Sequence, residues 1–350
     1  MRRSLVYQDI LAITVLTSGL KYLYLKFEII SSFLNTFLTL FVTETDLPDS
    51  SILLTLPSVL ANKPSPAYDS EENLAYYLGG LIEGDGSFSV PKFIKDSKGK
   101  KRVAGIEIIG NIKDKPAYDF LKTKFGGNVY HKKGKKTVRW MIKDLKSVIN
   151  VVNNINGKLR TPKIHRFHNM IDFLNLYYGT NISKLPLDNS PLFENAWLAG
   201  FIDSDGCFAI KGFTGNLRTY IAVQFYLAQR KVDISGVSML EIMQKISSFL
   251  DCNLKSKVIT LNKQEFEEYT VTTSNKNSNQ ILIDYFYNFH LLTSKYLDFK
   301  CFERANYLYI NKFHRDPVFY EEIRLLKSSM NNSRTEFNWN HLEQYKDINQ

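Results

Sequence analysis

Apolar and polar positions follow two similar series along the chain, one in each half of the sequence. Within each series, short stretches alternate between apolar and polar residues, which is typical of strands with one buried face. Longer stretches repeat apolar residues every three or four positions, which is typical of helices. In the first series we expect strands at Ser87–Ile94, Arg102–Ile109, Asn128–Lys132 and Thr137–Ile142, and helices at Lys115–Phe125, Leu145–Ile155 and Ile164–Tyr178.

The second series repeats this order. Strands are expected at Cys207–Phe213, Leu217–Phe225, Leu254–Leu261 and Glu268–Thr273, and helices at Val237–Leu250, Asn279–Phe289 and Lys295–Phe313. With the helical segment that opens each series, each half is predicted to run helix, two strands, helix, two strands, closing helices.

The segment that opens the first series recurs at the start of the second. Tyr77–Val90 and Trp197–Ile210 are identical at six of fourteen positions, and the other eight pair residues of similar character. An internal repeat of this kind indicates a duplicated structural unit. Two such units on one chain predict a pseudo-dimer with approximate two-fold symmetry.

The two series define the expected domains. They span residues 71–178 and 193–330, and a linker of Pro, Ser and Asn residues joins them at 179–192. Residues 331–350 are expected to form a polar tail. Residues 1–70 form a partly apolar leader of unknown role, in which Lys21, Lys26 and Glu28 interrupt the apolar stretch. A signal or transit segment and a translated leader with little folded role both remain open for it.

Each repeated segment is predicted to be a helix that ends at an Asp-Gly pair. Its apolar residues do not keep to one stripe, which indicates burial on more than one side. Asn73 and the pair Glu194-Asn195 mark the expected starts, and Gly86 and Gly206 are expected to form left-handed C-terminal caps.

Small residues predict that these two helices pack against each other: Gly79, Gly80, Ala199 and Gly200. Their C-terminal ends then meet, and Asp85 and Asp205 come together where the helix dipole disfavours negative charge by roughly 0.3–1 kcal/mol each. A divalent cation between them would reverse this penalty. Oxygen ligands exposed to water suit Mg²⁺, and we expect Mn²⁺ to be able to replace it. A single Asp-Gly pair often forms only a turn, but two in matching context point to a site.

The charge balance favours an anionic partner. Lys and Arg number 45 against 35 Asp and Glu, which gives a net charge of +10 at pH 7. A field of that sign concentrates polyanions such as nucleic acid or an anionic membrane surface. The three cysteines are too few and too scattered for a disulfide framework or a zinc site, and they suit a reducing compartment.

The segments Leu78–Gly86 and Leu198–Gly206 resemble the nine-residue signature of the LAGLIDADG homing endonucleases, in the single-chain branch with two motifs. The resemblance covers about Glu71 to Lys312. It implies an α+β fold of two pseudo-symmetric αββαββα halves, each with a four-stranded antiparallel sheet that forms a DNA-binding saddle, and with the motif helices at the interface. It also implies a monomer, acting as a pseudo-dimer, that makes a sequence-specific double-strand break at a long asymmetric site by Mg²⁺-dependent hydrolysis, and so promotes mobility of its host intron.

The resemblance assigns roles to several residues. Asp85 and Asp205 would bind the catalytic metal, and the neighbouring Gly84 and Ser204 are counted with that metal site. Glu83 and Asp203, two positions before the aspartates, would support it. Gln229 would help to order water, and Lys113 is its expected equivalent in the first half. Lys163 and Lys295, each at the start of a late helix, would act at the scissile phosphate.

The sheets would lie along the major groove, where Arg and Gln read base edges and Lys contacts phosphate. Two Lys-rich segments, 95–102 and 131–136, suit hairpin tips that reach along the duplex. The expected DNA-binding residues are Lys92, Lys95, Lys98, Lys100, Arg102, Lys132, Lys133, Lys135, Lys136, Arg139, Lys211, Arg218, Gln224, Lys255 and Lys257.

Three other functions remain open at this stage. The first is an RNA maturase that assists group I intron splicing, alone or beside the nuclease. The second is a catalytically silent DNA-binding protein, and the third is a membrane or structural role resting on the N-terminal apolar segment. Frequent Ile, Asn, Lys, Phe and Tyr indicate an AT-rich coding genome. With the resemblance, this favours an organelle-encoded protein of the mitochondrial matrix.

Overall fold

The computed structural model describes residues 70–343, apart from 96, 215–216 and 262. The chain divides into two compact units, residues 1–63 and 64–350, and the described residues all belong to the second. Apart from Ser70, the predicted leader lies outside the described residues. The side chain of Arg218 also lies outside them.

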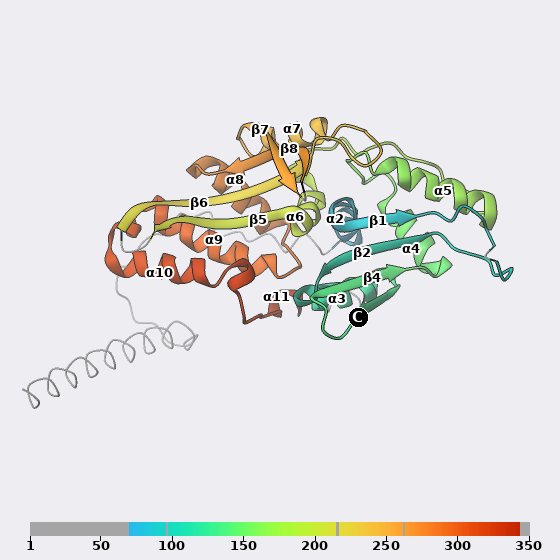
Figure 1. Cartoon of the computed structure of the whole chain (residues 1–350), viewed down its shortest axis with the longest axis horizontal. Helices are drawn as coiled ribbons and strands as arrows, with labels where there is room; N and C mark the ends of the chain where they lie inside the picture. Colours follow the sequence, from blue (N-terminus) through green and yellow to red (C-terminus); the bar gives the residue numbers. More distant parts are fainter. Residues whose placement is uncertain (1–69, 96, 215–216, 262, 344–350) are drawn as a thin grey trace, which may run out of the picture. The chain divides into compact units, whose positions relative to one another are not determined.

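The first half of the described unit contains two strand pairs, each preceded by a helix, and ends with two helices (Figure 1). Its elements are α2 Glu71–Asp85, β1 Gly86–Ser89, β2 Gly105–Asn111, the short 3₁₀ helix η3 Ile112–Asp114, α3 Lys115–Phe125, β3 Asn128–His131, β4 Thr137–Ile142, α4 Leu145–Ile155 and α5 Ile164–Tyr178.

The second half repeats this order and continues beyond it. Its elements are η4 Leu192–Glu194, α6 Trp197–Asp205, β5 Gly206–Thr214, β6 Leu217–Arg230, α7 Leu240–Phe249, β7 Leu254–Leu261, β8 Gln264–Thr273, α8 Lys276–Asn288, α9 Lys295–Ile310, η5 Phe313–Arg315, α10 Pro317–Ser328, η6 Asn331–Ser333 and α11 Asn340–Glu343.

Each half folds around its own antiparallel sheet. The strand orders are β1-β2-β4-β3 and β5-β6-β8-β7, so the same topology occurs twice. Matching registers support the equivalence: Gly86 pairs with Ile108 in the first half, and Gly206 pairs with Leu227 in the second. The predicted fold of two αββαββα halves with four-stranded antiparallel sheets is confirmed.

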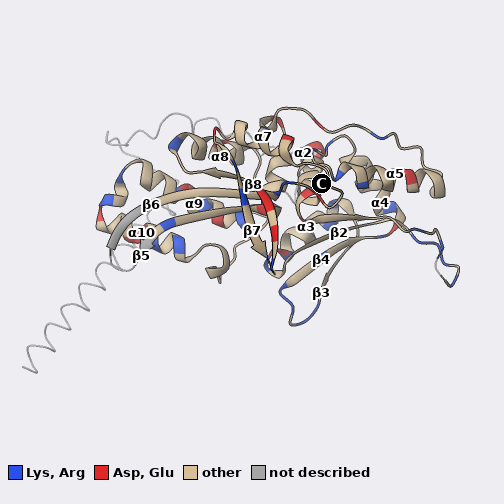
Figure 2. Cartoon of the chain, turned by 45° about the horizontal axis from the view of Figure 1, so that its top comes forward, with Lys and Arg blue, Asp and Glu red and all other residues tan. Residues whose placement is uncertain are grey.

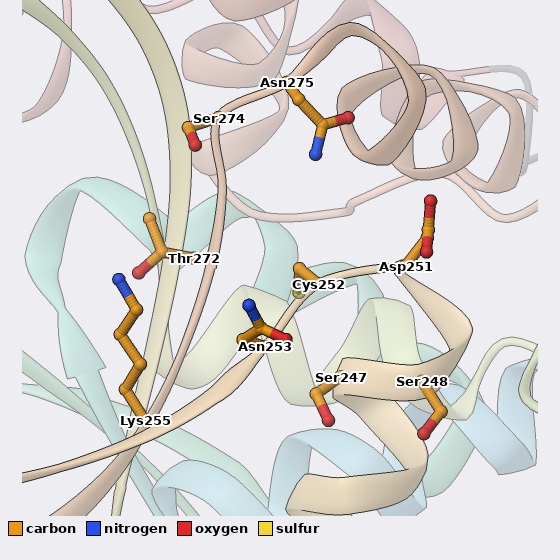
Figure 3. Close-up of a pocket in the computed structure, with 9 residues that line it drawn as sticks. All are labelled: Ser247, Ser248, Asp251, Cys252, Asn253, Lys255, Thr272, Ser274 and Asn275. Carbon is orange, nitrogen blue, oxygen red and sulfur yellow. The ribbon is translucent and has the colours of Figure 1, made fainter.

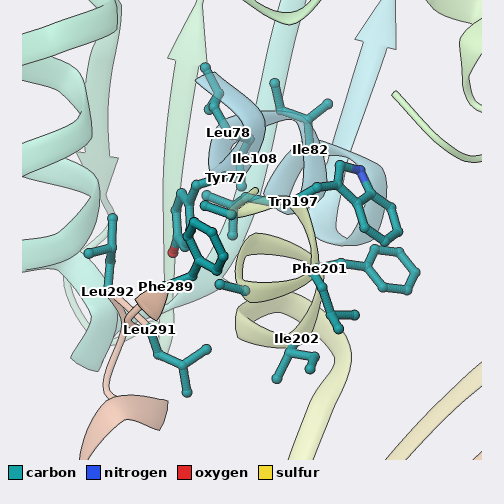
Figure 4. Packing of buried hydrophobic residues seen from close by; sticks show 14 of the residues in the cluster. Tyr77, Leu78, Ile82, Ile108, Trp197, Phe201, Ile202, Phe289, Leu291 and Leu292 are labelled. Carbon is teal, nitrogen blue, oxygen red and sulfur yellow. The ribbon is translucent and has the colours of Figure 1, made fainter. Parts of the chain in front are cut away.

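Side-chain alternation gives each sheet one buried and one exposed face, as strand geometry requires. On β4, Val138, Trp140 and Ile142 are fully buried, whereas Arg139 between them is exposed. The helices cover the buried faces. The core continues from these faces into the contact between α2 and α6, where Tyr77 and Trp197 lie among aliphatic and aromatic side chains (Figure 4).

The predicted glycine caps were wrong. Gly86 has φ −92° and Gly206 has φ −75°, so both are extended rather than left-handed. Each chain segment passes directly from helix into strand without reversing. Glycine is needed for space instead, because a Cβ on Gly86 would lie 2.7 Å from the Cα of Ile82. The first helix also begins before Asn73, at Glu71, because the Ser70 side chain caps it by accepting a hydrogen bond from the Asn73 N–H.

The predicted polar tail is folded onto the second half as far as it is described. Asn331 donates its backbone N–H to Asp298 and its side-chain amide to the carbonyl of Phe208. Further along, the rings of His341 and Tyr296 stack 4.2 Å apart, and Leu342 is buried. Buried apolar and aromatic side chains therefore hold this polar-rich segment in place. In the described part of the chain, the helices are too short or too polar to cross a membrane.

Candidate active site

Helices α2 and α6 are in backbone contact at two reciprocal glycines. A Cβ on Gly80 would lie 2.0 Å from the carbonyl oxygen of Trp197, and a Cβ on Gly200 would lie 1.9 Å from that of Tyr77. Neither position could hold a larger residue without separating the helices. The neighbouring small residue Gly79, also predicted at this interface, faces elsewhere, since its Cβ would meet the carbonyl of Lys158 at 3.3 Å. Ala199 donates its backbone N–H to the Tyr285 hydroxyl at 3.0 Å.

The C-terminal ends of the two helices also touch. A Cβ on Gly84 would lie 1.7 Å from the Ser204 hydroxyl and 2.9 Å from a carboxylate oxygen of Asp205. Burial, followed by the negative charge of Asp205, raises the pKa of Asp85 to about 6. The two aspartates predicted from the repeat are thus close enough to repel each other, which is the arrangement a shared cation would stabilise.

Buried acids two positions earlier join the two halves. Glu83 accepts from the backbone N–H of Arg160 and of Thr161, and from the indole of Trp197 at 2.6 Å. Asp203 accepts from the Tyr77 hydroxyl at 2.7 Å. In each case an aromatic residue of one motif helix donates to the acid of the other.

Asp203 is also bound within its own half. It accepts from the backbone N–H of Leu292 at 2.7 Å and from the Thr293 hydroxyl at 2.5 Å. Burial raises the pKa of Glu83 and of Asp203, while these donors act in the opposite direction. Both acids are fixed beneath the paired aspartates, where they hold the helix ends in position.

Lys163 and Lys295 cap the motif helices. The Lys163 amine donates to the carbonyls of Ile82, Gly84 and Gly86 at 2.8–3.1 Å. Lys295 donates to those of Ile202, Asp203 and Ser204 at 2.7–3.0 Å. Burial lowers the pKa of both amines, and the nearby carboxylates raise it. Each amine lies beside the aspartates, and its three hydrogen bonds go to carbonyls at or just after the end of a motif helix, where few intrahelical donors remain.

Gln229 contacts its aspartate, but the predicted equivalence with Lys113 was wrong. The Gln229 amide donates to Asp205 at 2.8 Å. The registers align Leu227 with Ile108, so the position two residues later in the first half is Gly110. Lys113 lies beyond the strand in η3, where its backbone N–H donates to the Asn111 side chain. Matching residues by local sequence had shifted the pairing by three positions.

Two residues at the site were missed. A Cβ on Gly110 would lie 2.2 Å from the Tyr118 hydroxyl, which occupies the space beside that glycine. Burial and the charges of Asp85 and Asp114 raise the pKa of Tyr118. Asp114 reaches into the second half, where it accepts from the backbone N–H of Ser294 at 2.9 Å. No local pattern in the sequence singles out either residue, because both reach the site through tertiary packing.

Most of the predicted DNA-binding side chains are exposed, in agreement with a role at the surface. Figure 2 shows basic residues at the loop between β3 and β4 and acidic ones along β8. Arg139 is paired with Glu107 at 3.1 Å and Lys257 with Glu268 at 3.4 Å, so these two cations are partly neutralised. Gln224 is half-buried, and the exposed residues are Lys92, Lys95, Lys98, Lys100, Arg102, Lys132, Lys133, Lys135, Lys136, Arg139, Lys211, Lys255 and Lys257.

A separate hollow of about 490 Å³ lies where α7 leads into β7 (Figure 3). Its lining is polar, and Lys255 points across it toward Thr272. Neither Asp85 nor Asp205 lines this hollow, and its charged side chains do not converge. Its lining residues are Ser247, Ser248, Asp251, Cys252, Asn253, Lys255, Thr272, Ser274 and Asn275.

The aspartate pair fits a hard divalent cation. Asp85 and Asp205 offer carboxylate oxygens from two adjoining helix ends, and burial together with the charge of Asp205 raises the pKa of Asp85. The described residues contain no group of three or more His, Cys, Asp or Glu side chains able to hold a metal. Two carboxylates, with water completing the coordination, suit Mg²⁺ better than zinc.

Two matching halves, joined by helices that end in paired carboxylates, define a single-chain pseudo-dimeric protein with a carboxylate pair between its halves. The family described as LAGLIDADG endonuclease matches the chain twice, at residues 78–174 and 198–306. The chain belongs to this family.

Individual relatives agree. The chain is 31% identical over 317 residues to the intron-encoded DNA endonuclease aI3 of Saccharomyces cerevisiae, covering 81% of this chain and 76% of that protein. It is 26% identical over 264 residues to probable intron-encoded endonuclease 4 of Neurospora crassa, covering 74% of this chain but only 44% of that protein. The homing endonuclease I-LtrWI, solved with target DNA, has the same fold, with a TM-score of 0.57 and 20% identity over 76% of this chain and all of its own.

Proposed function

We propose that the protein is a homing endonuclease that makes a sequence-specific double-strand break in DNA by Mg²⁺-dependent hydrolysis. The observation that carries the proposal is the meeting of Asp85 and Asp205 at adjoining helix ends. Family membership and the relationship to an intron-encoded DNA endonuclease support it. A catalytically silent DNA-binding protein would have no need of two charged groups held where they repel each other.

Each residue of the site has a definite task in this proposal. Asp85 and Asp205 hold the cation, with Gly84 and Ser204 allowing the helix ends to meet. When bound, the ion supplies Lewis-acid chemistry that makes water more acidic and neutralises charge on the phosphate. Gln229 orients the Asp205 carboxylate. Lys163 and Lys295 hold the helix ends and add positive potential where phosphate charge increases in the transition state.

The aspartates provide the direct test. Asp85→Asn and Asp205→Asn keep the shape of the site but remove a charged ligand, so both should bind the target duplex and lose nearly all double-strand cleavage. The substrate would be the joined exon sequence of the gene that carries the reading frame, on a plasmid with Mg²⁺. Full cleavage by both variants would contradict the proposal.

A second function at the RNA level has one specific observation in its favour. The chain is 32% identical over 139 residues to the intron-encoded RNA maturase bI4 of Saccharomyces cerevisiae, which covers 39% of this chain and 19% of that protein. We propose that binding of group I intron RNA is a second activity on the same basic scaffold. The test compares the affinity of Asp85→Asn for the intron RNA with its affinity for an unrelated structured RNA. Tighter binding of the intron RNA would support the proposal, and equal affinity for the two RNAs would count against it.

We further propose that the protein acts in the mitochondrial matrix as an organelle-encoded product. Intron-encoded relatives and the AT-rich residue usage support this location. The test is to map the reading frame, because a nuclear gene without an intron host would contradict the proposal.

A further inference from the structure

The two halves of the site differ beside their aspartates. Gly110 and Gln229 occupy equivalent positions, since Ile108 and Leu227 pair with the glycine that follows each motif helix. Residues two apart on a strand point to the same face, so any side chain at position 110 would point toward Asp85 as Gln229 points toward Asp205. In the second half, the amide reaches the carboxylate at 2.8 Å. In the first half, glycine supplies no side chain.

Tyr118 fills the space that Gly110 leaves. It comes from α3 rather than from the strand, and it packs against Trp140 with ring centroids 6.4 Å apart. Its hydroxyl lies 2.2 Å from the position of a Cβ on Gly110. The only polar atom of this side chain thus lies where the first-half counterpart of Gln229 would begin. Burial, followed by the negative charge of Asp85, raises the pKa of the phenol.

The two polar groups have different reach. An amide that starts at Cβ extends several bond lengths toward the carboxylate, whereas the phenol ends where that side chain would start. A hydroxyl set back by that distance is suited to act through one water, and water-mediated hydrogen bonds are nearly as favourable as direct ones. Phenols keep their proton at neutral pH, so the hydroxyl can always donate.

We propose that Tyr118 is the positioning residue for Asp85, acting through a bound water where Gln229 acts on Asp205 by direct contact. The inference rests on the proposed nuclease function. Its consequence is that the two strands of the duplex are cut at chemically different sites and at different rates. We expect the site with the direct amide contact to cut first, so that a nicked intermediate accumulates.

Strand-resolved cleavage tests this idea. The probe is a duplex selected for cleavage by the wild-type protein from a randomised DNA pool, with a different label on each strand. Tyr118→Phe removes only the hydroxyl, and we expect the slower strand to be cut roughly 10- to 100-fold more slowly, as for other residues that orient metal ligands. The other strand should change little. Gln229→Leu should slow cleavage of the faster strand.

A matched control and a rescue sharpen the result. Tyr178→Phe removes another first-half hydroxyl, one that donates to the carbonyl of Arg102, and it should leave the ratio of the two strand rates unchanged. The double substitution Gly110→Gln with Tyr118→Leu copies the second-half arrangement into the first half. Gly110 does not have a positive φ, so glutamine there needs no backbone strain. This variant should speed cleavage of the slower strand and move the ratio of the two strand rates toward one.

Each outcome decides the question. A wild-type protein that cuts no duplex overturns both this inference and the proposed function. A wild-type protein that cuts, with Tyr118→Phe showing the wild-type strand ratio, overturns the inference alone. Equal slowing of both strands with a lower melting temperature would mean that the hydroxyl is purely structural. If Tyr118→Phe does not fold, the double variant should still speed cleavage of the slower strand and Gln229→Leu should still slow cleavage of the faster strand. A strand ratio that stays at the wild-type value in both variants overturns the inference.

Discussion

At the scale of single residues, two lysines offset the charge that the site concentrates. Placing Asp85 and Asp205 at helix C-termini opposes the helix dipoles. Lys163 and Lys295 counter this by donating to three carbonyls each at those ends. The same lysines also lower the pKa of Asp85, against burial and Asp205. The two lysines that stabilise this negatively charged site are therefore the same residues that face the phosphate in the proposed reaction.

Replacing Lys295 by Met should destabilise the protein by about 3 kcal/mol, because it leaves carbonyls uncapped and carboxylates uncompensated. Urea denaturation would measure the loss. Lys300→Met, on the same helix, removes a half-exposed ion pair with Glu303 and the contacts of the amine with the rings of Tyr287 and Phe299, and should cost about 1 kcal/mol or less. Equal effects for the two variants would contradict the capping role.

The raised pKa of Asp85 makes cation binding depend on pH. In the metal-free protein this carboxyl titrates near 6 instead of 3.8. Between those values the folded protein holds a proton that the unfolded chain has released, so this group makes the free energy of unfolding fall as pH rises toward 6. Above pH 6 the Asp85 carboxylate is ionised and free to bind a cation, and below pH 6 a proton competes with the cation for it.

We therefore expect the apparent affinity for Mn²⁺ to fall as pH decreases through about 6. Free Mn²⁺ can be followed by electron paramagnetic resonance across that range. Asp85→Asn should bind the ion more weakly and lose the step. A wild-type affinity that stays constant through this range would show that Asp85 is not a ligand.

At the scale of elements, the site depends on the closeness of α2 and α6. Gly80→Ala would place a methyl group 2.0 Å from the carbonyl oxygen of Trp197, so the helices must separate. We expect a loss of about 3 kcal/mol or more in unfolding free energy, together with loss of cleavage as the aspartates move apart. Gly79→Ala is the matched control on the same helix. Its methyl would meet Lys158 at 3.3 Å, and the variant should stay within about 1 kcal/mol of wild type.

Elements with a strong periodic pattern could be predicted from the sequence. The bounds of α4 and α5 agree with the expected Leu145–Ile155 and Ile164–Tyr178, because their buried faces repeat at helical spacing. Helix α10 was missed. Only Ile323 of its residues is buried, so its pattern is weak.

The candidate site was most directly predictable where the repeat is exact. Asp85 and Asp205 occupy matching motif positions, so the repeat itself points to them. Lys113 was matched wrongly to Gln229 because the halves diverge after the second strand. Tyr118 reaches the site only through tertiary packing, which a local pattern does not record.

At the scale of the whole molecule, a net charge of +10 supplies attraction to any polyanion, but only some of the cations can face a duplex. Helices cover one face of each sheet, so the exposed lysines divide between sheet tips and helix surfaces. Four of them lie on the loop that joins β3 and β4: Lys132, Lys133, Lys135 and Lys136.

Replacing these four lysines by Gln should make DNA binding less dependent on salt. Each lost phosphate contact reduces the slope of log affinity against log salt by about 0.9, so the change should approach roughly 3.6 if all four contact phosphate. The matched control carries the same charge change at exposed positions outside that loop, Lys122→Gln, Lys146→Gln, Lys276→Gln and Lys312→Gln. If the loop lies along the duplex, the control keeps the wild-type slope, and the cleavage rate at saturating protein is unchanged in both. Equal slopes for the two quadruple variants would mean that only net charge matters and that this loop does not lie on DNA.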